Sequence, residues 1–355
     1  MTTQVNIVGS HGLYASYGGW DQLVINLAEL KSDQIDYLIF NPKETPITEK
    51  LDGVSVKQLP LSGSGAQGLI FDSLSILSSF SADVILMLGM KAMPVALCLK
   101  IIRPKLKLII NIGGIEWERP QFNPLFKFYL QFCFYLAKKV SNHLVIDNEH
   151  YQDFFDDTHS RRVTKISYGG IIDKSLHNTE VRSEFDFIDT DYYLSISRSI
   201  VDNKLQELCD LFSNLPSENL VLISNFSNSG YGRDVFNRYN SYPNIKLIDG
   251  LYEKPKLDIV RRSCRAYIHT HTLCGSAPSL IEMIVCRVPI YSIDVAQNRH
   301  TLADQGYYFG DFSDLKVMLE GGQLPNIPSL DFAGLYDWHS VVSEYERLVL
   351  EDAAV

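Results

Sequence analysis

Short apolar runs alternate with stretches of helical periodicity along most of the chain. Runs such as 106–110 are apolar without polar alternation, which is typical of strands covered by helices on both faces. In the first half the predicted strands are Val5–Val8, Tyr37–Phe40, Val54–Leu59, Val84–Leu88, Leu106–Ile110 and Leu144–Ile146, and the predicted helices are Asp21–Lys31, Lys91–Ile102 and Leu125–Lys139. This order predicts right-handed βαβ units and a parallel sheet.

The pattern lapses at residues 174–191, which are polar and acidic without a clear period and are interpreted as a linker. It then restarts with the predicted strands Tyr193–Ser197, Leu220–Ser224, Ile245–Ile248, Ala266–Thr270 and Pro289–Ser292 and the helices Lys204–Phe212, Lys256–Arg262, Ser279–Cys286 and Trp338–Leu350. We therefore expect an α/β protein with two Rossmann-like, doubly wound domains facing a cleft. Ligands of such sheets bind beyond the carboxyl ends of the strands, so the loops there are the candidate sites.

Composition narrows the class of protein. A length of 355 residues favours two domains. The formal charge of −10, from 32 basic and 42 acidic residues, argues against a general nucleic-acid binder. The six cysteines form no C-x-x-C pair, and the chain opens on a strand without a charged leader. We therefore expect free buried thiols, no signal peptide and a cytoplasmic protein.

The most apolar segment is Phe122–Val140, which is interrupted by Pro124, Lys127 and the pair Lys138–Lys139. It is too polar and too short to span a bilayer. Two interpretations remain open, a core helix and a helix lying on a membrane surface.

Two loops of the first half could carry chemistry. Residues 9–21 contain Gly18 and Gly19 at the start of a predicted helix, where free N–H groups and the helix dipole suit a phosphate or a reacting sugar. A strict G-x-G-x-x-G is absent, so a dinucleotide site is not favoured, and a packing turn is the alternative. Residues 111–119 contain Glu116 and Trp117, which would give a cleft a carboxylate and a stacking ring unless Glu116 only pairs with Arg119 at the surface.

Two loops of the second half are comparable. Arg198 and Lys204 flank a predicted helix start, a suitable arrangement for a diphosphate. Residues 275–279 resemble a phosphate-binding turn that leads into a helix. Glu282 is expected in the first turn of that helix. His269 and His271 lack metal-ligand spacing and are expected to be hydrogen-bonded in the wall of the cleft.

Taken together, these loops resemble the retaining family 4 glycosyltransferases of the GT-B fold, most closely the bacterial rhamnosyltransferase branch of surface polysaccharide (O-antigen or capsule) assembly. The resemblance runs over nearly the full length. It rests on Gly9-x-x-Gly12-x-x-Ala15-x-Tyr17-Gly18-Gly19, Gly114-Ile115-Glu116-Trp117-x-Arg119, Tyr168-Gly169-Gly170, Ser197-Arg198, Tyr267-Ile268-His269-x-His271, Pro278-Ser279-Leu280-Ile281-Glu282, Asn298-Arg299 and Tyr336-x-Trp338.

The resemblance implies an acceptor-binding domain, residues 1–175, a nucleotide-sugar-binding domain, residues 176–335, and a final helix, 336–355, that packs back on the first domain. The implied donor-binding residues are Gly18, Gly19, Arg198, Asn203, Lys204, His269, Gly275, Ser276, Ser279, Leu280 and Glu282. The implied acceptor-binding residues are Tyr17, Trp20, Glu116 and Trp117. Arg198, Glu116 and Glu282 would be catalytic, and neither a metal nor another cofactor is expected.

The chain also departs from the family pattern. Asn203 stands where the common pattern has its Lys, and Cys274 replaces the first of two glutamates, as in the rhamnosyltransferase branch. Gly113 and Ala277 replace an acidic residue and an Asn near the expected sugar pocket.

The resulting prediction is retaining transfer of a sugar, with dTDP-rhamnose the favoured donor, to a lipid-linked saccharide. The enzyme would be cytoplasmic, with peripheral contact to the inner face of the plasma membrane. The alternatives are an epimerase-like sugar-nucleotide enzyme of the same fold and a non-catalytic nucleotide-binding subunit of a transferase.

Overall fold

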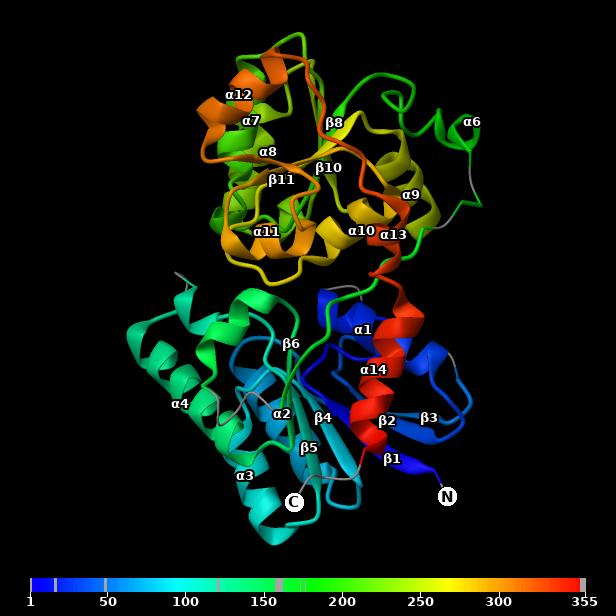
Figure 1. Cartoon of the computed structure of the whole chain (residues 1–355), viewed down its shortest axis with the longest axis vertical. Coiled ribbons are helices and arrows are strands. Elements are labelled where there is room, and N and C mark those ends of the chain that lie inside the picture. The colour runs from blue at the N-terminus through cyan, green and yellow to red at the C-terminus, as the bar shows by residue number, and fades with distance from the viewer. Residues whose placement is uncertain are drawn as a thin grey trace. The chain divides into compact units, whose positions relative to one another are not determined.

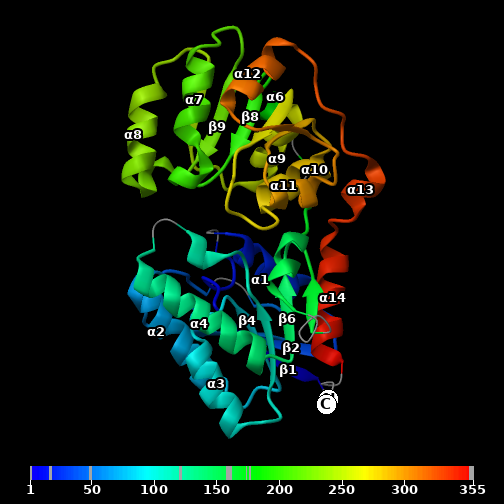
Figure 2. The same ribbon diagram turned by 60° about the vertical axis from the view of Figure 1, so that its left-hand side comes forward.

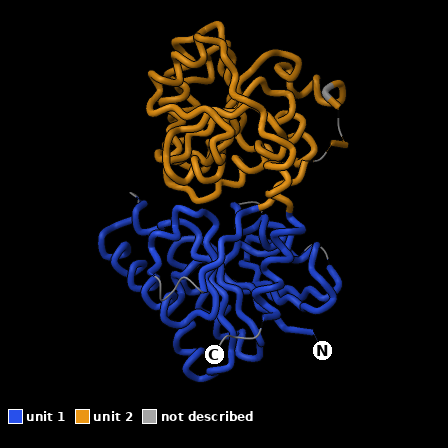
Figure 3. Tube along the Cα trace, viewed as in Figure 1, with its two compact units in different colours: residues 1–168, 338–355 blue, residues 169–337 orange. Residues whose placement is uncertain are grey.

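The computed structural model describes residues 2–15, 18–47, 50–119, 122–156, 162–172, 174–175 and 177–351. The chain divides into two compact units (Figure 3). The first contains residues 1–168 and 338–355, and the second contains residues 169–337. The C-terminal segment therefore belongs to the same unit as the N-terminus.

The first unit is built on a seven-stranded sheet with the order β3-β2-β1-β4-β5-β6-β7 (Figure 1). Its strands are β1 (Thr3–Val8), β2 (Ile35–Asn41), β3 (Val54–Gln58), β4 (Val84–Leu88), β5 (Lys107–Asn111), β6 (His143–Ile146) and β7 (Val163–Lys165). Every neighbouring pair is parallel, as the alternating pattern predicts. Its helices are α1 (Gly19–Leu30), α2 (Gly65–Ser78), α3 (Met93–Ile102), α4 (Pro124–Val140) and α14 (Trp338–Leu350), with 3₁₀ turns η1 (Glu116–Glu118) and η2 (Glu149–Phe154).

Helices cover both faces of this sheet, which explains the apolar character of its strands. Helices α2, α3 and α4 lie side by side on one face, where Ile85, Met87 and Ile110 join their buried side chains in one core (Figures 1 and 2). Helices α1 and α14 pack together on the other face. There the hydroxyl of Tyr345 accepts a hydrogen bond of 2.8 Å from Nδ2 of Asn111, which ties α14 to β5.

The second unit has a six-stranded sheet of order β10-β9-β8-β11-β12-β13, again parallel throughout. Its strands are β8 (Tyr193–Ile196), β9 (Leu220–Ser224), β10 (Ile245–Asp249), β11 (Ala266–His269), β12 (Ile290–Ile293) and β13 (Tyr307–Phe309). Its helices are α6 (Asn178–Val181), α7 (Leu205–Ser213), α8 (Gly230–Tyr239), α9 (Lys254–Ser263), α10 (Pro278–Cys286), α11 (Ala296–Leu302), α12 (Phe312–Glu320) and α13 (Leu330–Gly334), with 3₁₀ turns η3 (Val201–Asn203) and η4 (Phe226–Asn228). The predicted fold class, two doubly wound parallel sheets in series, is confirmed.

The interpretation of residues 174–191 as a simple linker is wrong. The segment contains the short helix α6, and its apolar side chains Phe185, Phe187 and Ile188 are buried in the second unit. Phe187 also meets the ring of Tyr192 edge-on at 5.2 Å between centroids. With Val181, four described residues of this eighteen-residue segment are buried, which is too few to give a periodic signal, so the sequence pattern did not reveal the packing.

Each sheet has one point where the strand order reverses. In the first unit it lies between β1 and β4, and in the second between β8 and β11. Adjacent loops diverge there and leave room for a ligand at the carboxyl ends of the strands. Both points coincide with motifs that the sequence indicated, the loops after β1 and β8.

Candidate functional site

The loop after β1 lies directly against the end of β4, and glycine makes this approach feasible. Gly9 has φ +99°, and a Cβ there would lie 2.1 Å from the carbonyl oxygen of Leu88. Any larger residue would push the loop away from the switch point of the sheet. The opening glycine of the motif is therefore required by packing, whatever ligand the loop binds.

The same loop is fastened to the start of α1 by Asp21. This carboxylate is only 1% exposed and accepts hydrogen bonds from the backbone N–H of His11 at 3.0 Å and of Gly18 at 3.1 Å. The imidazole Nδ1 of His11 lies 3.5 Å from the same carboxylate. Gly18, the N-cap of α1, is exposed, and no atom lies within 4 Å of the place where its Cβ would be. The predicted Gly18-Gly19 helix start is thus open to solvent, while Tyr17 lies outside the described residues.

Trp20 fills the space beside the loops after β4 and β5. A Cβ on Gly89 would lie 2.9 Å from its ring, and a Cβ on Gly113 would lie 2.6 Å from it. Both glycines have positive φ, and the N–H of Gly113 donates a 2.8 Å hydrogen bond to Oδ1 of Asn111. An acidic side chain at position 113 would displace Trp20. The indole Nε1 is buried and has no hydrogen-bond partner among the described residues.

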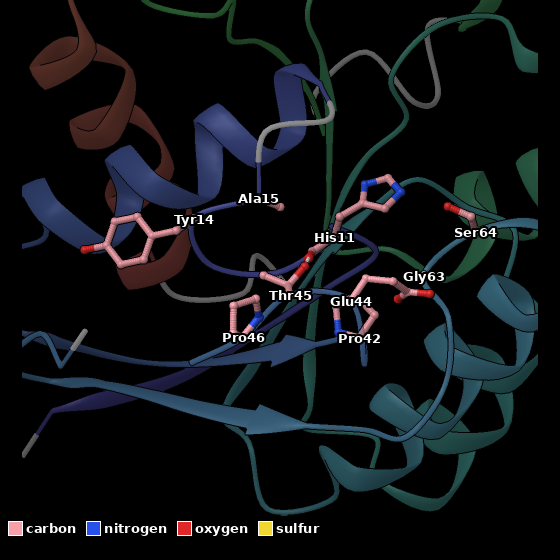
Figure 4. A pocket seen from close by; sticks show the side chains of 9 residues that line it. All are labelled: His11, Tyr14, Ala15, Pro42, Glu44, Thr45, Pro46, Gly63 and Ser64. Atoms are coloured by element: carbon pink, nitrogen blue, oxygen red, sulfur yellow. Dashed lines mark hydrogen bonds between the residues drawn. The ribbon is translucent and has the colours of Figure 1, made fainter. Parts of the chain in front are cut away.

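A pocket of about 380 Å³ opens in the first unit at the carboxyl ends of β1, β2 and β3 (Figure 4). It is lined by His11, Tyr14, Ala15, Pro42, Glu44, Thr45, Pro46, Gly63 and Ser64. A hydrogen bond to the side chain of Ser62 lowers the pKa of Glu44, which keeps this carboxylate ionised. The hydroxyl of Thr45 donates a 2.6 Å hydrogen bond to the carbonyl of His11 and so joins two of the lining loops. An imidazole, a carboxylate and hydroxyl groups in one small pocket suit a ligand rich in hydroxyls.

Sequence reasoning did not assign these lining residues. Their loops follow three strands that are neighbours in space, but they lie tens of residues apart in the chain. One signal was present, because Pro42–Pro46 and Gly63–Ser64 each follow a predicted strand and are rich in turn-forming residues. Only the spatial order of the strands brings them beside His11.

Glu116 and Trp117, predicted to line a cleft and here called the lip, lie in the 3₁₀ turn η1 after β5. Oε1 of Glu116 accepts a 3.0 Å hydrogen bond from Nε of Arg119 in a partly buried ion pair, so the pairing that we considered as the alternative does occur. The Trp117 ring contacts Phe134 of α4 at 5.0 Å and Phe154 at 6.2 Å between centroids. The lip is therefore anchored on the core of the first unit.

In the second unit, the loops after β8 and β11 are fastened to each other. The hydroxyl of Thr270 donates a 2.6 Å hydrogen bond to the carbonyl of Asn203, and that of Thr272 donates a 3.1 Å bond to the carbonyl of Asp202. Nδ2 of Asn203 donates a hydrogen bond of 2.8 Å to the carbonyl oxygen of Arg198. Asn203 is thus buried, and its side chain holds the loop in place.

Arg198 and Lys204, the two cations predicted for a diphosphate site, lie on either side of η3. Arg198 is exposed on the loop, and Lys204, with φ +53°, is the N-cap of α7. Nζ of Lys204 lies 3.8 Å from a carboxylate oxygen of Glu207, one turn into the helix. Two cations beside a helix start can attract an anion, in competition with Glu207, which already pairs with Lys204.

His269 is fully buried at the end of β11 and belongs to a chain of polar rings. Its Nδ1 lies 3.5 Å from the hydroxyl of Tyr267, and its Nε2 lies 3.3 Å from Nδ1 of His271. Burial, with a smaller contribution from the neighbouring His271, holds the pKa of His269 well below its ordinary value, so the ring is neutral. The prediction that His269 and His271 are hydrogen-bonded agrees with these contacts. The described residues contain no cluster of three or more His, Cys, Asp or Glu side chains able to hold a metal.

The turn into α10 contains the other predicted donor residues. Gly275 and Ser276 are buried just before the helix, Ser279 is half-buried in its first turn, and the side chain of Leu280 is fully buried in the core. The expectation that Glu282 lies in the first turn is wrong, because α10 begins at Pro278 and no acidic residue occurs in that turn.

Glu282 lies one turn deeper, 8% exposed, where it pairs with Arg261 of α9. Arg261 is itself buried and also donates a 2.7 Å hydrogen bond to Asp258. Nζ of Lys254 contacts the second oxygen of Asp258 at 2.5 Å. Glu282 is therefore the outermost carboxylate of a buried charge network. This network joins two helices and was not visible in the sequence.

A further polar cluster follows β9 and was not anticipated. The backbone N–H of Ser199 donates a hydrogen bond of 2.9 Å to Oδ1 of Asn225. The carbonyl of Ser199 accepts a hydrogen bond of 2.8 Å from the hydroxyl of Ser229, which is the N-cap of α8. A Cβ on Gly232 would lie 2.4 Å from the carbonyl oxygen of Phe226, so this glycine lets the helix start approach the loop. The start of α8 thus joins the loop that carries Arg198.

Comparison with known proteins identifies the fold. Residues 2–171 match a family described as a domain of unknown function, DUF1972. No curated protein matches the chain. Sucrose-phosphate synthase from Thermosynechococcus elongatus superposes with a TM-score of 0.77 at 12% identity, over 98% of each chain.

Two further solved structures extend this result. HepE from Anabaena, in complex with UDP-glucose, gives a TM-score of 0.71 at 13% identity over 98% of this chain and 99% of that one. A UDP-forming trehalose-phosphate synthase from Burkholderia xenovorans gives 0.67 at 12% identity over 100% of both chains. The chain has the GT-B fold. No helix in the described part of the chain is long and apolar enough to cross a membrane.

Proposed function

We propose that this protein is a glycosyltransferase that takes a sugar from a nucleoside diphosphate donor. The observation that carries the proposal is the placement of Arg198 and Lys204, two cations beside a helix start at the switch point of the second sheet. The GT-B fold supports it, since HepE has this fold and was solved with UDP-glucose bound.

The proposed donor site lies in the loops after β8 and β11. Arg198 and Lys204 would neutralise the diphosphate. Asn203 would act indirectly, because its side chain holds the carbonyl of Arg198 in place. Glu282 is the proposed partner of the ribose, and its pairing with Arg261 would fix the direction in which the carboxylate points.

The proposed acceptor site is the pocket of the first unit. Hydroxyls of a saccharide would meet the carboxylate of Glu44, the imidazole of His11 and the hydroxyls of Thr45 and Ser64. The lip formed by Glu116 and Trp117 and the indole of Trp20 remain proposed acceptor contacts. The buried Nε1 of Trp20, which has no partner among the described residues, could donate to a sugar oxygen after a small rotation of the ring.

In finer detail, we propose rhamnose as the sugar, dTDP as the nucleotide and a lipid-linked saccharide of bacterial surface polysaccharide synthesis as the acceptor. The proposed mechanism is retention. The bond between the anomeric carbon and the diphosphate breaks, the departing phosphate oxygen takes the proton of the acceptor hydroxyl, and that hydroxyl bonds to the same face of the sugar. The protein would supply positioning and electrostatic stabilisation, with no metal ion.

Turnover with a panel of donors tests this proposal. The full-length protein is incubated with dTDP-rhamnose, UDP-glucose and GDP-mannose, with and without an extract of lipid-linked saccharides, and release of the nucleoside diphosphate is measured. Acceptor-dependent release supports a transferase, and an isomerised nucleotide-sugar formed without acceptor identifies an epimerase. Binding of a donor without either product identifies a non-catalytic subunit, and no binding of any donor contradicts the proposal.

A further inference from the structure

Helices α2, α3 and α4 present a broad apolar surface to solvent. Helix α2 packs beside α3, and α3 beside α4, on one face of the sheet of the first unit (Figures 1 and 2). The large exposed apolar side chains of these helices and of their ends, here called the apolar face, are Ile70, Leu74, Leu77, Phe80, Ile101, Ile102, Leu125, Phe128, Phe132 and Tyr135. Large apolar side chains exposed on neighbouring helices are a feature of interaction sites.

Helix α4 shows that this exposure is organised. Leu125, Phe128, Phe132 and Tyr135 recur at intervals of three and four residues and share one side of the helix. Leu125 is 80% exposed and Phe128 is 69% exposed. The opposite side, with Leu130, Cys133, Phe134, Leu136 and Ala137, is buried. The segment is therefore a core helix on one side and an unpartnered apolar helix on the other.

The charge of this surface is opposite to that of the whole chain. In α2, α3 and α4, all of whose residues are described, the one acidic residue is Asp72, which is 4% exposed and pairs with Lys91 at 3.1 Å. Basic residues in these helices and directly after α3 are Lys100, Arg103, Lys105, Lys127, Lys138 and Lys139. The protein as a whole carries a formal charge of −10.

Several of these cations lie over aromatic rings. Nζ of Lys139 is 5.8 Å from the centre of the Tyr135 ring on the apolar face, and Nζ of Lys138 is 4.9 Å from that of Phe134 on the buried side of α4. The guanidinium of Arg103 is 5.6 Å from the centre of the Phe80 ring at the end of α2. Side chains placed this way keep apolar stems on the surface and a charge at its margin, which suits the boundary between acyl chains and anionic headgroups.

We propose that the apolar face docks on an anionic lipid bilayer. Burial of Leu and Phe side chains would supply the apolar part of the binding, and each nearby Lys or Arg would add electrostatic attraction to anionic lipid. A symmetric dimer through this face would bring the lysines of α4 in the two copies together, which disfavours a second copy as the occupant.

The apolar face is also connected to the proposed acceptor site. The ring of Trp117 packs on Phe134, on the buried side of α4. The lip at Glu116 and Trp117 therefore packs on the side of α4 opposite the apolar face, and docking of that face would fix the helix that supports the lip. This reason for docking rests on the proposed function, whereas the docking itself does not.

Vesicle co-sedimentation of the full-length protein tests the proposal. We expect binding to vesicles rich in phosphatidylglycerol, weaker binding at high salt and little binding to pure phosphatidylcholine. The variant Leu125→Ser/Phe128→Ser should lower the partition coefficient by about tenfold or more, because each side chain contributes a large apolar area. The matched control is Leu330→Ser/Leu335→Ser in the second unit, where the two side chains are 69% and 70% exposed.

Four outcomes decide the matter. Loss of vesicle binding in Leu125→Ser/Phe128→Ser, with an unchanged melting temperature and normal binding by the control, supports the docking surface. Absence of wild-type binding to anionic vesicles overturns it, as does equal binding by both variants. A concentration-dependent dimer that the α4 variant abolishes, without vesicle binding, would assign the surface to a second copy instead. No donor or acceptor is present in this assay, so failure of the proposed transferase activity leaves its result unaffected.

Discussion

The guanidinium of Arg261 pairs with the carboxylate of Glu282 inside the second unit, joining α9 to α10. Both side chains are almost excluded from solvent, and Asp258 completes the set of buried charges. A carboxylate in this position has a structural role in addition to any contact with a ligand. Variants of Glu282 must therefore be judged by stability as well as by activity.

We predict that Glu282→Ala destabilises the protein. Removing one partner of a buried ion pair leaves the other charge poorly compensated, which typically costs about 3–5 kcal/mol. Glu282→Gln keeps the shape and an oxygen acceptor for Arg261, so its loss should be smaller. Urea unfolding of the two variants measures the difference, and equal stability of wild type and Glu282→Ala would remove the structural role.

A second prediction concerns the close approach of Trp20 to Gly113. Gly113→Ala places a Cβ 2.6 Å from the indole in a backbone of φ +63°, so we expect a loss of about 1–3 kcal/mol. The control is Gly230→Ala, where no atom lies within 4 Å of the added Cβ. Chemical denaturation with tryptophan fluorescence as the signal measures both variants. Similar midpoints for the two would contradict the packing described for Trp20.

The buried His269 predicts a loss of stability in acid. Its folded-state pKa lies well below 6.5 because of burial, so the unfolded chain takes up a proton that the folded chain refuses. The stabilisation is complete above pH 6.5 and decreases as the pH falls below that value, by about 1.4 kcal/mol per pH unit for one proton. His269→Gln should flatten this slope between pH 6.5 and 5. An unchanged slope in thermal unfolding would show that His269 does not carry the effect.

The proposed use of protein cations predicts that chelation leaves transfer intact. Arg198 and Lys204 would neutralise the diphosphate, so turnover should survive EDTA at its normal rate. Loss of turnover in EDTA and its recovery with manganese would show that a metal neutralises the donor. Thermal unfolding in EDTA serves as the control for general destabilisation.

The sequence predicted the parallel sheets and the loops at their switch points because both depend on local patterns. Gly18 and Gly19 at the start of a helix and Arg198 after a strand are examples. The pairing of Arg261 with Glu282 could not be predicted, since it joins two helices through tertiary packing. The same holds for the pocket, whose lining comes from three separate loops.

Helix α2 escaped prediction for a different reason. It buries Phe71 and Ile76 while exposing Ile70, Leu74 and Leu77, so apolar residues occur around the whole helix. A helix with two apolar sides lacks the 3.6-residue periodicity that reveals a helix with one. The exposed apolar residues that obscure the periodicity of α2 are also part of the apolar face.

Calorimetric titration of the full-length protein with dTDP and UDP tests the central claim, a nucleoside diphosphate site at Arg198, most directly. We predict one binding site per chain for at least one of these nucleotides. Arg198→Ala should weaken it by about ten- to a hundredfold, because a hydrogen bond to a charged group contributes about 1.5–3 kcal/mol. The control Arg238→Ala, at the exposed end of α8, should bind as the wild type does. Absence of nucleotide binding by the wild type, or equal affinity of wild type and Arg198→Ala, would contradict the account.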